Sequence, residues 1–114
     1  MPSRGEVWLA NLHTRRGTEL GKTRPVLIVQ AQSLIDVSHP STLIIPLTTN
    51  LLDDAEPLRI RVRAQGRLRR DSDLLIDQIR ALDNNFLVQG PFTQIDDATM
   101  NRVGAAMRHV LGLT

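Results

Sequence analysis

The stretch GTELGKTRPVLIV, residues 17–29, determines how this 114-residue chain folds. Its polar half carries Glu19, Lys22 and Arg24, and these charges lead directly into an apolar run, Pro25 to Gln30. The run is rich in β-branched residues, which predicts a central strand covered on both faces. Proline is tolerated at the first position of such a strand. We therefore expect the charged side chains at the mouth of a buried strand, where a rigid sheet can orient them.

Further short strands are predicted around this segment, separated by turn residues. Residues 58–64 alternate cleanly, with apolar side chains inward and Arg59, Arg61 and Arg63 outward. Pro46 indicates a bulge or a sheet edge within its strand. The predicted strands span residues 6–12, 25–30, 42–49 and 58–64, followed by pieces at 74–76 and 79–82 that form two short strands or one bent strand.

The clearest predicted helix runs from Asp96 to Leu111. Asp96 is suited to cap its first turn, and Gly112 is suited to end it. Short helical turns are also expected at residues 31–35 and 83–86. Strands followed by a terminal helix indicate one α+β or mainly-β domain over residues 1–114. The helix face expected to pack on the sheet is an apolar stripe of Met100, Val103, Met107, Val110 and Leu111.

The composition favours a polyanionic partner. Of the 14 basic residues only Lys22 is a lysine, and arginine forks suit bidentate recognition of phosphate. The aromatic residues Trp8, Phe86 and Phe92 are too few for a surface built mainly on base stacking. The sequence has no cysteine, no apolar run near the roughly 20 residues of a membrane helix and no N-terminal signal pattern. We expect a cytoplasmic protein with no membrane partner.

Several enzyme classes lack their motifs in this sequence. There is no Walker loop, no dinucleotide-type glycine motif and no nucleophile elbow. His13, His39 and His109 are far apart in the sequence and show no metal-ligand spacing. The pair Asp53 and Asp54 is best explained as part of a solvated acidic loop. No metal and no other cofactor is therefore expected.

Five motifs in a fixed order give the strongest indication of function. They are RGEVW at 4–8, the segment 17–29, PLTT at 46–49, RDS at 70–72 and DQIR at 77–80, followed by the amphipathic helix. Together they resemble the MazF/PemK family of toxin ribonucleases, and the likeness covers nearly the whole chain. The resemblance implies a small, strongly curved SH3-like barrel, as in CcdB and PemK, with a C-terminal helix.

The resemblance implies two catalytic residues. Arg24 matches the arginine of the family's Arg-Pro motif, and Thr48 matches its catalytic threonine. A guanidinium is suited to clamp phosphate oxygens and stabilise developing charge, but it is a poor general base because it holds its proton. Thr48 can donate to a phosphate oxygen or relay a proton. Glu19 is either a base or a partner that orients Arg24.

Sequence-selective binding of RNA requires donors and acceptors that reach splayed bases. The loop and turn residues near the motifs are the candidates, although each of them can also serve only solvation or turn structure. One loop departs from the family, because residues 11–16 read NLHTRR where the family often has an Asp-Xaa-Pro-like run. We therefore predict no cleavage motif. The candidate substrate-binding residues are Thr18, Glu19, Lys22, Ser72, Asp77 and Gln78.

The function implied is a sequence-selective, metal-independent endoribonuclease that cuts single-stranded RNA and forms the toxin half of a toxin–antitoxin pair. Its products would carry a 2′,3′-cyclic phosphate and a 5′-hydroxyl. The resemblance also implies a homodimer and a cognate antitoxin that covers the RNA groove with a disordered acidic segment. The alternative is a CcdB-like poison of DNA gyrase that acts by protein binding without catalysis. A catalytically inactive RNA-binding relative is a third possibility.

An arginine stripe follows the motif at 46–49. It has three readings: a solvated strand face that also protects a sheet edge, a track for phosphates, or a contact for the antitoxin. The stripe comprises Arg59, Arg61, Arg63, Arg67, Arg69 and Arg70.

Overall fold

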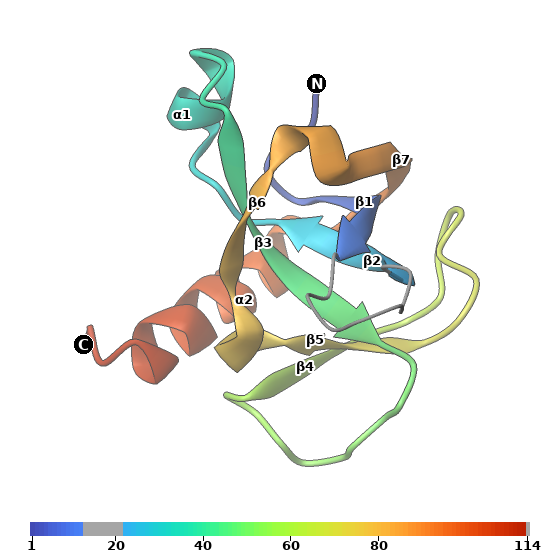
Figure 1. The fold of residues 1–114 in the computed structure, drawn as a ribbon. Coiled ribbons are helices and arrows are strands. Elements are labelled where there is room, and N and C mark those ends of the chain that lie inside the picture. Colours follow the sequence, from blue (N-terminus) through green and yellow to red (C-terminus); the bar gives the residue numbers. More distant parts are fainter. Residues whose placement is uncertain (13–21, 114) are drawn as a thin grey trace, which may run out of the picture.

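A computed structural model describes residues 1–12 and 22–113, and these form a curved antiparallel sheet with one long helix packed against it (Figure 1). The sheet order is β4-β5-β3-β2-β1-β7, with β6 also paired to β3. The elements are β1 Glu6–Leu12, β2 Lys22–Ile28, α1 Gln32–Asp36, β3 Ser41–Thr48, β4 Arg59–Val62, β5 Ser72–Leu75, the 3₁₀ turn η1 Ile76–Gln78, β6 Arg80–Asp83, the 3₁₀ turn η2 Asn84–Phe86, β7 Leu87–Gln94 and α2 Asp97–Val110.

Strand β3 joins the two halves of the sheet. One edge of β3 pairs with β2, from Ile44 to Pro46. The other edge pairs with β6 as far as Ile44 and then with β5 from Leu47. Pro46 lies between these two partners, where a residue without an N–H group costs the sheet no ladder hydrogen bond. Since η1 connects β5 to β6, the two short strands together form the bent strand that the sequence allowed.

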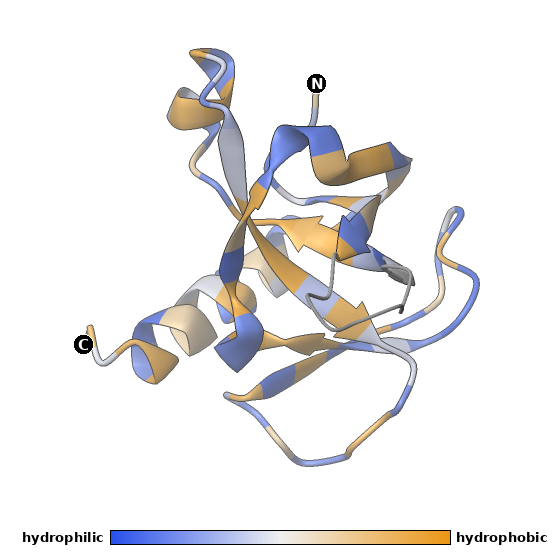
Figure 2. Ribbon diagram, viewed as in Figure 1, coloured by the Kyte–Doolittle hydropathy of each residue, from blue (hydrophilic) through white to orange (hydrophobic). Residues whose placement is uncertain are grey.

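Two apolar cores lie on the two faces of the sheet, and strand β2 contributes to both. Leu27 faces one core, while Val26 and Ile28 face the other, as the period of two in a strand requires. Helix α2 covers the first core with Val103 and Ala106. The orange centre of the sheet in Figure 2 marks these buried strands. The prediction of a central strand covered on both faces is therefore confirmed.

The mainly-β class with a C-terminal helix is confirmed, and several boundaries differ from the prediction. Pro25 lies inside β2, opposite Leu9, and does not start the strand. It is tolerated there because β2 pairs with β3 only from Val26 onward, which leaves that edge of β2 open at Pro25. Helix α2 ends at Val110, and Gly112 follows with a φ of +69°, as a helix stop requires.

Three further predictions were wrong in detail. Strand β7 was missed, because Gly90 and Pro91 interrupt its apolar pattern and its pairing with β1 shifts register twice. Asp96 precedes helix α2 as expected, but its side chain makes no capping hydrogen bond. Leu111, assigned to the packed stripe, is 52% exposed because it lies just beyond the end of the helix. Among the described residues, no helix combines the length and apolar character that crossing a membrane requires.

Two glycines give opposite predictions for the same substitution. A Cβ added at Gly90 would lie 2.4 Å from Trp8 Cδ2, whereas a Cβ at Gly104 in helix α2 meets nothing within 4 Å. Gly90→Ala should lower the free energy of unfolding by about 1–3 kcal/mol through overpacking. Gly104→Ala should raise it by about 0.5–1 kcal/mol, because alanine loses less backbone entropy in a helix. Urea denaturation of both variants checks the signs, and equal effects would contradict the packing of β7 on Trp8.

Candidate active site

Arg24 and Thr48 lie at neighbouring ends of β2 and β3. The pairing of these strands ends with Val26 opposite Pro46, so Arg24 and Thr48 each lie two residues beyond the last pair. Alternation along each strand places both residues on one face of the sheet. Arg24 is exposed and Thr48 is partly exposed. The structure thus brings the two residues predicted as catalytic to one open edge.

The same level of the sheet continues into two more strands. Thr48 is the ladder partner of Asp73 on β5, and Asp73 is the partner of Arg61 on β4. Residues directly opposite in antiparallel strands point to the same face, so these three side chains form one row across the sheet. We call Thr48, Asp73 and Arg61 the cross-strand row. The sequence analysis assigned no role to Asp73.

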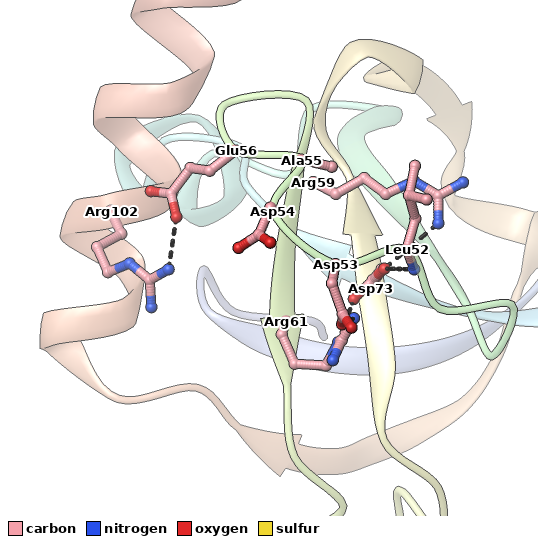
Figure 3. A pocket seen from close by; sticks show the side chains of 9 residues that line it. All are labelled: Leu52, Asp53, Asp54, Ala55, Glu56, Arg59, Arg61, Asp73 and Arg102. Carbon is pink, nitrogen blue, oxygen red and sulfur yellow. Dashed lines mark hydrogen bonds and ion pairs between the residues drawn. The ribbon is translucent and has the colours of Figure 1, made fainter.

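Asp73 is a buried carboxylate with three donors (Figure 3). Its side chain is only 2% exposed. One oxygen accepts from Arg61 Nε at 2.6 Å, and the other accepts from the Leu52 amide at 2.9 Å and from Arg59 Nη1 at 3.3 Å. Arg61 also donates to Asp53 at 2.8 Å, at the surface. The carboxylate therefore connects β5 with β4 and with the loop that follows β3.

The charges at this centre stabilise one another. Burial opposes the ionisation of Asp73, but hydrogen bonds from Arg61, from the Leu52 amide and from Arg59 outweigh it, so the pKa of Asp73 lies below its ordinary value. The hydrogen bond to Asp73, followed by the one to Asp53, raises the pKa of the Arg61 guanidinium. Asp73 is thus an anion, and Arg61 a cation, throughout the neutral range.

A tight turn after β3 holds the hydroxyl of Thr48. The Asn50 amide donates to Thr48 Oγ1 at 3.1 Å, and Arg59 Nη1 donates to the Asn50 carbonyl at 2.8 Å. The Leu52 amide, two residues further on, donates to Asp73. Within this turn the Asn50 carbonyl is therefore held by Arg59 of β4, and the Leu52 amide by Asp73 of β5.

This arrangement corrects the prediction for the arginine stripe. Arg59 and Arg61 alternate with buried residues as expected, but they bind Asp73 and are only partly exposed, because β5 places that carboxylate beside them. Arg63 is exposed. Arg67 stacks over the Phe92 ring at 5.0 Å, so the stripe does not form one continuous solvated face.

The structure gathers only part of the predicted substrate-binding set. Thr18 and Glu19 lie outside the described residues, and Lys22 is the first residue of β2. Ser72 is buried and donates its hydroxyl to the Arg70 carbonyl at 3.1 Å. It also lines a mainly apolar cavity of about 290 Å³, together with Pro25, Thr49, Arg67, Leu68, Arg69, Arg70 and Phe92.

Asp77 and Gln78 lie on a different segment from Arg24 and Thr48, the two residues predicted as catalytic. Both are exposed on η1, which follows the end of β5 that lies away from Ser72. Since Thr48 pairs with Asp73 near the start of β5, the sheet does not bring Asp77 or Gln78 next to it. Any contact of these two residues with substrate would involve a nucleotide away from the scissile phosphate.

A larger polar cavity of about 510 Å³ lies over the charged centre (Figure 3). Its walls are the loop of residues 52–56, the side chains of Arg59, Arg61 and Asp73, and Arg102 of helix α2. Arg102 is ion-paired with Glu56 at 2.7 Å, so the loop is also tied to the helix. No group of three His, Cys, Asp or Glu side chains that could hold a metal ion occurs in the described part of the chain.

We predict that Asp73→Asn lowers the free energy of unfolding by about 1.5–3 kcal/mol at neutral pH, the typical worth of hydrogen bonds to a charged group. Because the pKa of Asp73 is lowered in the folded state, its contribution is complete above the unfolded value of about 3.9 and is lost as the pH falls below it. The stability gap between wild type and variant should therefore be constant above about pH 5 and close toward pH 2.

The matched control is Asp53→Asn, which removes the other carboxylate on Arg61. Asp53 is 82% exposed, so its loss should cost no more than about 1 kcal/mol. Denaturant titrations from pH 2 to pH 7 measure both variants. Equal losses, or a gap that does not depend on pH, would contradict the role assigned to Asp73.

Comparison with known proteins places this chain in a family. The family model described as PemK-like, MazF-like toxin of type II toxin-antitoxin system matches residues 3–111. The endoribonuclease MazF of Staphylococcus saprophyticus is 34% identical over 115 residues, which cover 99% of this chain and 93% of the relative. The endoribonuclease EndoA of Bacillus subtilis is 31% identical over 111 residues, covering 96% and 94% of the two chains.

Solved structures share the fold at lower identity. A MazE–MazF crystal structure from Deinococcus radiodurans matches with a TM-score of 0.79 and 18% identity, over 99% of this chain and 98% of the other. A mycobacterial endoribonuclease in complex with its cognate antitoxin matches with a TM-score of 0.73 and 23% identity, over 99% and 95% of the two chains. These likenesses confirm the curved-sheet fold expected from the sequence motifs. The family model and the two relatives together show that the chain belongs to the PemK-like, MazF-like toxins of type II toxin–antitoxin systems.

Proposed function

We propose that this toxin endoribonuclease cuts single-stranded RNA at selected sequences, needs no metal ion, and uses Arg24 and Thr48 as its catalytic residues. The observation that supports the proposal is the register of β2 and β3, in which Arg24 and Thr48 each follow the last paired residues by two positions and lie on one accessible face. Two relatives over 30% identical are named endoribonucleases, which supplies the reaction class. The gyrase poison considered as an alternative is not favoured by these relatives.

In the proposed reaction the substrate supplies its own nucleophile. The 2′-hydroxyl loses its proton, and its oxygen forms a bond to the adjacent phosphorus. The bond between phosphorus and the 5′-oxygen breaks, and that oxygen takes up a proton. The fragments carry a 2′,3′-cyclic phosphate and a 5′-hydroxyl, and later addition of water opens the cyclic phosphate to a 3′-phosphate.

The two catalytic residues have different roles in this scheme. Arg24 offers a planar fork to the non-bridging phosphate oxygens and stabilises the charge that develops on them. A guanidinium keeps its proton in proteins, so Arg24 does not serve as the general base. Thr48 donates a hydrogen bond to a phosphate oxygen or relays a proton. The exposed position of Arg24 lets an incoming phosphate reach both residues.

Selection of the sequence would fall to residues that reach splayed bases. The candidates are Thr18, Glu19, Lys22, Ser72, Asp77 and Gln78. Among them, Ser72 has the best-defined surroundings, because it lines an apolar cavity with a rim of arginines. Such a cavity suits one unstacked base, and Arg67 over the Phe92 ring offers a further stacking plane.

The proposal extends to the partners of the toxin. By family resemblance the chain acts in the cytoplasm as a homodimer, with RNA bound in a groove along the dimer interface. A cognate antitoxin would inhibit it by laying a disordered acidic segment over that groove. Structures of a MazE–MazF pair and of a mycobacterial endoribonuclease with its cognate antitoxin support such a partner.

We predict that Arg24→Ala lowers the rate of RNA cleavage by about 10²- to 10³-fold without changing the fold, the usual effect of removing one preorganised charge stabiliser. Arg24→Lys should also be impaired, because lysine lacks the planar fork. Single-turnover assays on an RNA pool measure the rates, and circular dichroism checks the fold. Arg108→Ala, which removes an exposed arginine from helix α2, is the charge-matched control and should cleave normally. Wild-type cleavage by folded Arg24→Ala would refute the assignment.

We also predict that cleavage persists in excess EDTA and that the products carry 5′-hydroxyl ends. The attacking group belongs to the substrate, so an RNA with hydrogen in place of the 2′-hydroxyl at the scissile position should stay intact. Mapping the ends of cleaved RNA with and without EDTA tests both statements. Activity that is lost in EDTA and restored by Mg²⁺, or cleavage of the 2′-deoxy substrate, would require a different mechanism.

A further inference from the structure

The hydroxyl of Thr48 is constrained on its acceptor side. Its oxygen accepts a hydrogen bond from the Asn50 amide at 3.1 Å. A threonine hydroxyl has one hydrogen to donate and two lone pairs, so this contact leaves the hydrogen available. With the amide fixed on one side, the O–H bond has fewer directions in which to point. Thr48 is thus prepared to donate to a group on the open face of the sheet.

The residue that carries this amide is also held by the charged centre. Arg59 Nη1 donates to the Asn50 carbonyl at 2.8 Å and to Asp73 at 3.3 Å. Asp73 also accepts from the Leu52 amide at 2.9 Å. One buried carboxylate therefore anchors the turn directly at Leu52, and through Arg59 at Asn50, whose amide binds Thr48.

We propose that Asp73 is a positioning residue for catalysis, which orients the Thr48 hydroxyl through Arg59 and the turn of residues 49–52. The inference rests on the proposed function, because it requires Thr48 to touch the scissile phosphate. Asp73 itself is buried and does not contact substrate. Its influence passes through the hydrogen bonds that one of its oxygens accepts from the Leu52 amide and from Arg59, and through its place opposite Thr48 in the β3–β5 ladder.

A purely structural role would not require a carboxylate at this position. Buried ion pairs contribute little net stability compared with well-packed apolar residues, and all four residues of β5, Ser72 to Leu75, are buried. An apolar residue would fit the strand equally well by this measure. The acceptor oxygen makes the difference at the turn, because an apolar side chain could bind neither the Leu52 amide nor Arg59.

A double-mutant cycle between Asp73 and Thr48 separates positioning from stability. The substrate is a short synthetic RNA centred on a cleavage site mapped from the pool, assayed in single turnover with saturating enzyme. Asp73→Asn should slow cleavage by about 10- to 100-fold, the scale expected when a catalytic group is misplaced by about an ångström. In a Thr48→Val background the same substitution should change the rate by less than about twofold, because coupled residues are not additive.

Two measurements and two further variants make the test decisive. RNA affinity, measured on a 2′-deoxy analogue, should change by less than about threefold in Asp73→Asn, since the loss falls on an interaction made in the transition state. Circular dichroism at the assay temperature gives the folded fraction, and rates are compared per folded molecule. If Asp73→Asn does not fold, Arg59→Gln tests the same chain of contacts and should show the same dependence on Thr48. Asp53→Asn is the control and should behave like wild type.

Each outcome has a distinct meaning. A rate loss that disappears in the Thr48→Val background supports the inference. Equal losses in both backgrounds, or a loss confined to RNA affinity, would overturn it while leaving the proposed function intact. Wild-type protein that does not cut RNA, or Thr48→Val that cuts as fast as wild type, would instead refute the proposed function and remove the basis of the inference.

Discussion

The hydrogen bonds of the ionised Asp73 carboxylate hold together the segments of the sheet and loop that surround Thr48. It lies between two arginines of β4 and also holds the first turn after β3, so three segments meet on one buried anion. Removing such a group would leave Arg59 without its carboxylate partner and the Leu52 amide without an acceptor. The loop after β3 would then depend on its other contacts, which include Arg59 on the Asn50 carbonyl and Arg102 on Glu56.

The two prolines explain why Arg24 and Thr48, the residues proposed as catalytic, lie at an open edge. Pro25 and Pro46 have no N–H to donate, and each lies where its strand lacks a ladder partner on one side. Pairing of β2 with β3 therefore stops at Val26, one residue after Pro25, and Arg24 is left beyond the paired region. Such an edge is normally a risk for aggregation, and here a charged side chain and a closed turn protect it.

The sequence predicted much of the sheet because its signals are local. The apolar run after Pro25 and the alternation around Ile60 each indicate the burial of one strand. The motif match singled out Arg24 and Thr48 as candidate catalytic residues. Strand β7 escaped prediction because its fit depends on Gly90 meeting the Trp8 ring, a contact between distant segments. Asp73 escaped because its partners come from another strand and a loop. An aspartate within the apolar stretch SDLLI was nevertheless a signal, since a charge at a buried position requires a partner.

The face of the sheet that carries Thr48 and Arg24 therefore combines a hydrogen-bonded side chain, Thr48, with an exposed one, Arg24. Thr48 accepts a hydrogen bond from the Asn50 amide in the turn after β3, while Arg24, paired with Ala10 of β1 but beyond the pairing of β2 with β3, is exposed. A fixed donor is most useful where charge develops at one atom, because it needs no reorganisation during the reaction. An exposed arginine is most useful for capturing a phosphate that arrives in many orientations, since long-range attraction acts before precise geometry is reached. On the proposed function, binding would fall mainly to Arg24 and orientation mainly to Thr48, with both acting together at the scissile phosphate.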